Sequence, residues 1–288
     1  MTLIDEMFSF TTSFFANASV TALIAGNIST DASMRCIEDV FLLFGQRDIM
    51  LSAQSRPFQP IVNIPVNRPF LLRVMPNNIK EKNTCVELYF QQGPFDMHRL
   101  TMLDLLDQII SEPYFDDLRT KQQLGYHVEC GVRQTYGVLG YCFVVVTSSH
   151  SAEEVQNAVL KFASSAADFL MNYPDEGFLN NLNALRDHFL QPHPSLAIAA
   201  RDIWTEVEER RYAFNHATMQ AALLSTIKKE ELAAFAYSLF CSEKKLLVIH
   251  SSVEDDVTEQ ECAEIKSTFD IIEKAEDLHR IGTYDAFM

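Results

Sequence analysis

The sequence predicts an α+β fold, in which a mainly antiparallel sheet has helices packed on one face. From residue 69 onwards, short apolar segments and amphipathic segments follow one another in the order β-β-α-α-β-β-α-α-α-α-α-β. The segment Tyr141–Val146 is apolar on both faces, which is typical of a strand covered by helices. A hydrophobic share of 48% with 21 Phe is sufficient for a packed core and argues against disorder.

The first 65 residues predict a strand, a helix and a linker. Residues 20–28 are apolar and β-branched and end in a Gly-Asn turn, which indicates a strand. Residues 29–44 begin with three candidate N-caps and predict a helix that ends before Gly45. The stretch 45–65 contains three prolines and no periodic pattern, so we expect a domain boundary there. A strand so close to Met1 indicates a chain that opens inside a domain, and its exposed edge would favour self-association as a homo-oligomer.

The remaining elements follow from periodicity and end signals. Expected strands lie at 69–75, 84–91, 125–133, 137–148 and 245–250, with the first two on either side of a Pro-Asn-Asn turn. Expected helices lie at 96–111 and 114–123, and further helices run from a capping box at Ser151–Glu154 to about Phe240. Two prolines end one of these helices, and Ser195 can cap the next one.

Composition excludes several classes of function. The net charge of −16 disfavours DNA, RNA and anionic membranes as partners, because these require clustered Lys and Arg. The six cysteines form no C-x-x-C pair, so we expect reduced, mostly buried thiols in an intracellular, cytoplasmic protein. No apolar run is long enough to span a bilayer. The acidic run that begins at Glu254 is expected to form a solvated surface helix or loop.

The run Leu118–Tyr126 is the most informative segment. It predicts a helix that breaks at Pro113, a short second helix that carries Arg119, a stop at Gly125, and Tyr126 just beyond it. A guanidinium and a phenol close together on such a turn can hold a peptide carbonyl or a developing oxyanion. The competing interpretation is an ion pair of Arg119 with a neighbouring carboxylate, Asp116 or Glu112, beside a packed tyrosine.

The histidines do not indicate a metal site. No H-x-x-E-H pattern occurs, and His188 and His193 are five residues apart with Pro192 between them. His127 follows Tyr126 directly and is expected to point to the opposite face of its strand, in a structural role. Nucleophile elbows, Walker loops and dinucleotide-binding glycine loops are also absent from the sequence.

The Leu118–Tyr126 run resembles a motif of the insulysin–pitrilysin–nardilysin family of zinc peptidases, the inverzincins. Two further segments, Ala22–Ile28 and Asn83–Tyr89, resemble strands of that family, and the resemblance covers roughly residues 15–250. A later stretch that resembles the family contains Trp204, Tyr212, Phe214 and Asn215. In such enzymes four homologous domains form two halves around a chamber, and the N-terminal half carries zinc. The resemblance implies that residues 1–64 are the end of the third domain plus a linker, and that 65–288 are the fourth domain with an acidic C-terminal tail.

The resemblance also implies a function. The chain would be the non-zinc C-terminal half of an insulysin-like metalloendopeptidase, which closes the chamber and binds peptide substrates. Arg119 and Tyr126 would be supporting catalytic and substrate-binding residues, and the chain would hold no cofactor of its own. Its partner would be the zinc-bearing N-terminal half of the same polypeptide, and alone it would be inactive.

Two alternatives stay open at this point. One is a catalytically silent structural homologue, like the core subunits of a respiratory complex, and the other is a free-standing peptide-binding module. The presence of both Arg119 and Tyr126 favours the peptidase interpretation.

Overall fold

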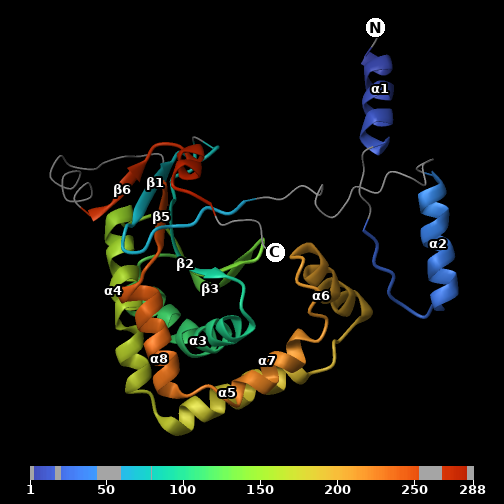
Figure 1. The fold of residues 1–288 in the computed structure, drawn as a ribbon. Helices are drawn as coiled ribbons and strands as arrows, with labels where there is room; N and C mark the ends of the chain where they lie inside the picture. Colours follow the sequence, from blue (N-terminus) through green and yellow to red (C-terminus); the bar gives the residue numbers. More distant parts are fainter. Residues whose placement is uncertain (1–2, 17–20, 44–59, 79, 253–267, 284–288) are drawn as a thin grey trace. The chain divides into compact units, whose positions relative to one another are not determined.

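A computed structural model describes residues 3–16, 21–43, 60–78, 80–252 and 268–283 (Figure 1). The chain divides into two compact units, one made of residues 1–59 and 192–208 and the other of residues 60–191 and 209–288. The assignment of residues 1–64 to a preceding homologous domain, with 65–288 as the next one, stays a prediction.

The described part of the first unit is helical. Its helices are α1 (Leu3–Ala16), α2 (Thr30–Leu43) and α6 (Leu196–Glu208). The prediction of a strand at 20–28 is wrong for the described residues 21–28, where Ile28 N donates to Gly26 O (3.0 Å) in a turn. Strand-like composition is insufficient there because a strand also needs a neighbour with which it can exchange backbone hydrogen bonds. The helix expected at 29–44 is confirmed as α2, and Ser29 Oγ accepts from Ala32 N (3.3 Å) at its start.

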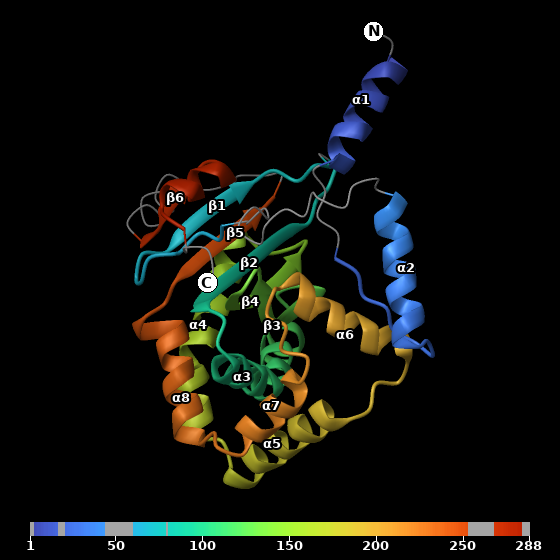
Figure 2. The ribbon, with the colours of Figure 1, turned by 45° about the vertical axis from the view of Figure 1, so that its right-hand side comes forward.

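The second unit contains one six-stranded mixed sheet, which confirms the α+β prediction (Figures 1 and 2). Its strands are β1 (Phe70–Val74), β2 (Thr84–Pro94), β3 (His127–Thr135), β4 (Val138–Thr147), β5 (Leu246–Ser251) and β6 (Asp270–Ile272). They lie in the order β3-β4-β2-β5-β1-β6. The pairs β3–β4, β4–β2 and β2–β5 are antiparallel, whereas β1 pairs in parallel with β5 and β6. Although β1 and β2 are consecutive in the chain, β5 lies between them, so they form no hairpin.

Helices cover one face of this sheet. They are α3 (Met97–Phe115), α4 (Ala152–Met171), α5 (Asp175–Leu190), α7 (His216–Leu224) and α8 (Lys229–Tyr237). Helices α3 and α4 pack on the sheet, α8 packs against both, and α5 and α7 pack on the outer side of α3. At the centre of the core, Phe143 of β4 meets Phe90, Tyr114 and Phe240, with ring centroids 5.0–6.0 Å apart. On the other face, Ile64 packs against β1 in a smaller cluster with Phe70, Leu72 and Ile272.

Helix α3 does not break at Pro113, contrary to the prediction. The helix continues through this residue and passes into a π-helical turn, Asp116–Lys121. A proline inside a helix costs one backbone hydrogen bond and crowds the preceding turn. Tyr114 and Leu118, on either side of the junction, are both fully buried in the core. Their burial accounts for the continuation of the helix past the proline.

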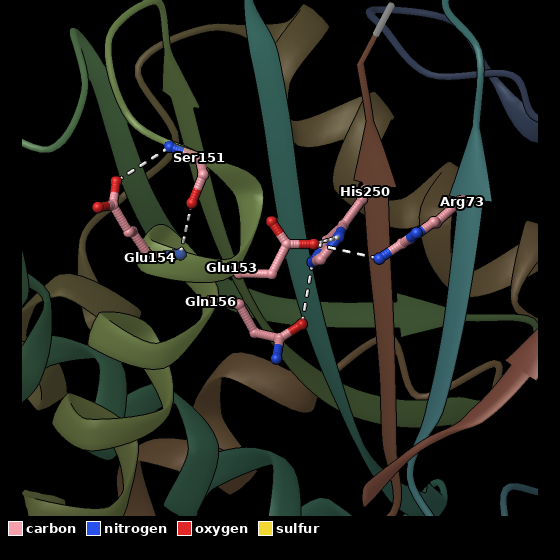
Figure 3. Close-up of polar contacts among 6 residues, drawn as sticks. All are labelled: Arg73, Ser151, Glu153, Glu154, Gln156 and His250. Carbon is pink, nitrogen blue, oxygen red and sulfur yellow. Dashed lines mark hydrogen bonds and ion pairs between the residues drawn. The ribbon is translucent and has the colours of Figure 1, made fainter. Parts of the chain in front are cut away.

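The N-terminus of α4 begins with the expected capping box, which is confirmed (Figure 3). Glu154 N donates to Ser151 Oγ, and Ser151 N donates to Glu154 Oε2, both over 3.1 Å. These reciprocal bonds satisfy two backbone donors of the first helical turn. The direction in which the chain enters α4 is therefore fixed at Ser151.

A buried polar network attaches the same helical turn to the sheet (Figure 3). Glu153 Oε1 accepts from Arg73 Nη2 of β1 (3.2 Å) and lies 3.9 Å from His250 Nδ1 of β5. His250 Nε2 lies 2.9 Å from Gln156 Oε1, within hydrogen-bonding distance. Burial, aided by Arg73, lowers the pKa of His250 to about 4, so the ring is neutral at physiological pH. The start of α4 is thus held by the sheet as well as by its cap.

The thiols are less buried than the sequence suggested. Cys36 is exposed, whereas the other cysteines of the described residues are partly buried and unpaired: Cys85, Cys130, Cys142 and Cys241. Burial raises the pKa of Cys130 and of Cys142 to about 12. Both therefore remain thiols rather than reactive thiolates at neutral pH.

A carboxyl group between α3 and α7 should make folding stability depend on pH. Burial raises the pKa of Asp104 to about 7 and the neighbouring Asp107 adds to the shift, although Gln220 Nε2 donates to Asp104 Oδ2 over 2.6 Å. An unfolded Asp titrates near ~3.9, so between about pH 4 and pH 7 the folded chain binds more protons and stability falls as pH rises.

The variant Asp104→Asn keeps the acceptor for Gln220 and cannot ionise. Above pH 7 we expect its free energy of unfolding to exceed that of the wild type by roughly 1–2 kcal/mol. This difference is smaller than the full pKa shift would give, because Asp104 keeps some solvent contact. Near pH 4 the two proteins should converge. Urea unfolding at several pH values measures this difference, and a difference that does not change with pH would contradict the assignment.

Candidate functional site

One cleft of about 690 Å³ opens beside the end of α3. Three segments of the second unit line it, namely the helix end with its π-helical turn, the chain just before β3, and the turn between β4 and α4. The lining residues are Phe115, Arg119, Thr120, Gln123, Gly125, Tyr126, Thr147, Ser148 and Ser149. The cleft contains one guanidinium and five hydroxyl groups but no carboxylate, in a chain whose net charge is −16.

The turn that carries Arg119 and Tyr126 is held rigidly. Leu118 and Leu124 are buried on either side of it, and Leu124 N donates to Leu118 O (3.0 Å). Gln123, rather than Gly125, adopts the left-handed conformation that ends the helix (φ 54°), which corrects the prediction of a glycine stop.

Gly125 has a different role, because it permits a close approach to β4. A Cβ at this position would lie 2.4 Å from Val146 O and 2.9 Å from a methyl group of Val145. The next residue is tied to the same point, since Tyr126 N donates to Val146 O (3.1 Å). The absence of a side chain at Gly125 therefore fixes the position of Tyr126 against the sheet.

Arg119 is partly exposed in the cleft and makes no ion pair with Asp116, contrary to the competing interpretation. Asp116 is paired with Lys121 instead, over 2.7 Å. Among the residues that the structure describes, the Arg119 guanidinium has neither an ion pair nor a hydrogen bond. Its donors are therefore available to a ligand.

Tyr126 has 58% of its surface exposed. Its phenol makes no hydrogen bond within the described parts of the chain, so it can donate to a group in the cleft. The structure thus brings Arg119 and Tyr126 to the same cleft, as the sequence suggested.

Sequence reasoning missed the third wall of the cleft. Thr147, Ser148 and Ser149 lie more than twenty residues beyond Tyr126, and only the pairing of β3 with β4 brings them near it. Short hydroxyl residues are common wherever a chain enters a helix. The local sequence therefore does not show that these three residues line a cleft. Thr120 and Gln123 belong to the recognised run but were not singled out.

The described residues do not fit a zinc ion. Among them, no three His, Cys, Asp or Glu side chains come together in a group that could hold a metal. His127 pairs with Glu129 (3.2 Å), and His193 pairs with Asp202 (3.2 Å). The acidic run from Glu254 lies outside the described residues. No helix in the described ranges is long and apolar enough to cross a membrane.

Comparisons with known proteins show the family of the chain. A family described as the PQQ synthase PqqF-like C-terminal lobe domain 4 matches residues 105–204, which include the turn and the cleft. A nardilysin-like protein of Arabidopsis thaliana is 30% identical over 244 residues, which cover 82% of this chain. The chain belongs to the insulysin–pitrilysin–nardilysin family. Within that family it corresponds to the C-terminal half, as the resemblance implied.

Two further members of the family support this placement. Insulin-degrading enzyme of Homo sapiens is 28% identical over 219 residues, or 75% of this chain and 21% of the enzyme. The crystal structure of pitrilysin superposes with a TM-score of 0.70 at 16% identity, over 88% of this chain and 26% of pitrilysin, and shows the same fold. The chain spans less than a quarter of the nardilysin-like protein and of insulin-degrading enzyme, at 23% and 21% of their lengths.

Proposed function

We propose that this chain is the non-zinc C-terminal half of an insulysin-like metalloendopeptidase, in which it closes the chamber, binds peptide substrates and assists their hydrolysis. The observation that carries the proposal is the cleft that Arg119 and Tyr126 share. Both side chains have unused donors there, and no carboxylate competes for them.

The two side chains suit different moments of amide hydrolysis. The guanidinium of Arg119 can donate two parallel hydrogen bonds to peptide carbonyl oxygens. The phenol of Tyr126 can donate to the oxygen on which negative charge develops during attack on the carbonyl carbon. In this proposal Arg119 orients the peptide, and Tyr126 stabilises the reacting group.

The proposal assigns the remaining catalytic groups to other parts of the enzyme. The described residues contain no metal-binding group, so the proposal assigns zinc to the N-terminal half of the same polypeptide. The partners are therefore peptides and that N-terminal half, and the chain alone is expected to be inactive. Nucleic acids and anionic membranes stay excluded as proposed partners because of the charge of −16.

A binding experiment on the chain tests the proposal. Arg119→Ala should weaken the binding of a fluorescein-labelled, end-blocked Ala/Gly peptide by roughly ten-fold or more, because hydrogen bonds to a charged donor contribute about 1.5–3 kcal/mol. Fluorescence anisotropy measures the affinity, and thermal unfolding provides the fold control. The melting temperature should change little, because the guanidinium makes no ion pair or hydrogen bond among the described residues.

Lys121→Ala is the matched control, since Lys121 lies on the same turn but outside the cleft and pairs with Asp116. It should bind the peptide as the wild type does. Equal affinity of Arg119→Ala and the wild type would favour the silent structural homologue. A lower melting temperature with proportionate loss of binding would mean that Arg119 is structural.

A further inference from the structure

The turn between β4 and α4 offers an acceptor to the cleft, whereas Arg119 and Tyr126 offer donors. Thr147 Oγ1 accepts from both Ser149 N and His150 N, each over 3.3 Å. These bonds occupy the lone pairs of the buried threonine and fix the turn. The far end of the turn is fixed by the Ser151 capping box and by the network that holds α4 to the sheet (Figure 3).

The hydroxyl of Ser149 lies within hydrogen-bonding distance of its neighbour His150. Ser149 Oγ lies 3.1 Å from His150 Nδ1. When His150 Nδ1 carries no proton, the single hydroxyl proton of Ser149 is donated to it, and both oxygen lone pairs remain free. Ser148 also lines the cleft, and among the described residues its hydroxyl makes no hydrogen bond, so it can take either a donor or an acceptor role.

A peptide group needs this combination of partners. Its carbonyl requires a donor, its N–H requires an acceptor, and an unmet N–H in a desolvated site costs as much as a lost hydrogen bond. Arg119 can satisfy only carbonyl oxygens, because a guanidinium has no acceptor, and in the proposed function Tyr126 also donates to one. No carboxylate lines the cleft, so a neutral oxygen must accept from the peptide N–H.

Building on the proposed function, we infer that Ser149 is a specificity-determining residue that accepts a hydrogen bond from a backbone N–H of the bound peptide, with His150 as its positioning residue. The site then recognises main chain rather than side chains. It selects extended peptides with a free N–H at one position and discriminates against substrates that lack it.

Ester substitution in the peptide tests this directly. The probe is the same end-blocked, fluorescein-labelled Ala/Gly peptide, together with a set of depsipeptides in which each amide in turn is an ester. For one position the wild-type chain should bind the amide about three- to ten-fold more tightly than the ester, the contribution of one neutral hydrogen bond. In Ser149→Ala this ratio should fall to about one. The weaker carbonyl of an ester affects every variant equally, so the change in the ratio reports the N–H alone.

Two further variants provide the controls. Ser149→Thr keeps the hydroxyl and should retain the amide preference, and Ser148→Ala changes the adjacent cleft residue and should retain it as well. The inference is overturned if no ester position weakens binding to the wild type, or if Ser149→Ala keeps the wild-type ratio. If Arg119→Ala weakens peptide binding but no ester substitution does, only this inference is refuted and the proposed function is retained. A chain that binds no peptide refutes the proposed function with it.

Discussion

Tyr126→Phe should lower kcat of the metallopeptidase that contains this chain by about 10²–10³-fold, with little change in stability. The substitution removes one hydroxyl and almost no volume. The phenol is exposed and makes no hydrogen bond in the described structure, so folding does not depend on it. Because the donor acts on charge that develops during the reaction, kcat should fall while KM changes little.

Steady-state kinetics with one peptide substrate, together with the melting temperature, measure this effect. Tyr136→Phe is the matched control, since Tyr136 is similarly exposed, at 49% against 58% for Tyr126, but lies in the β3–β4 turn at the other end of the strand. The control should keep wild-type activity. If Tyr126→Phe retains near-full kcat/KM, Tyr126 is not a catalytic donor, and the role implied by the family motif fails at this residue.

Local signals in the sequence predicted the elements whose ends are set by local chemistry. The gap between the strands expected at 125–133 and 137–148 is an example, because Tyr136 and Gly137 there both have positive φ (43° and 79°), as a tight hairpin requires. The capping box at Ser151 is another, since its two hydrogen bonds join residues three positions apart. Such features need no knowledge of the remainder of the fold.

Features that depend on distant partners could not be predicted in this way. β6 has only three residues and pairs with β1 across almost two hundred residues of chain. The break at Pro113 was expected from local sterics, but burial of Tyr114 and Leu118 outweighs them. The residues of the candidate site fall into the same two groups, locally predictable and dependent on distant partners. Arg119 and Tyr126 lie in one recognisable run, whereas Ser149 reaches the cleft only through the sheet.

Gly125 connects the fold to the site, and Gly125→Ala should destabilise the chain by about 1–3 kcal/mol. The new Cβ would lie 2.4 Å from Val146 O, and this neighbour is backbone of β4, which is paired with β2 and β3 on its two sides, so it cannot rotate away. Either β4 or the turn must move. A shift of the turn would also displace Tyr126, whose N–H is bonded to the same carbonyl oxygen.

Gly131→Ala is the control, because nothing lies within 4 Å of the position that its Cβ would occupy. This change on β3 should be neutral or stabilising by about 0.5–1 kcal/mol, since glycine is unfavourable inside a strand. Urea unfolding measures both variants, and peptide binding at a temperature where both are folded measures the cleft. We expect Gly125→Ala to bind the peptide more weakly even when fully folded, and Gly131→Ala to bind it normally. Equal stability of the two variants would show that the contact with Val146 does not constrain the turn, and that the positions of Arg119 and Tyr126 are set elsewhere.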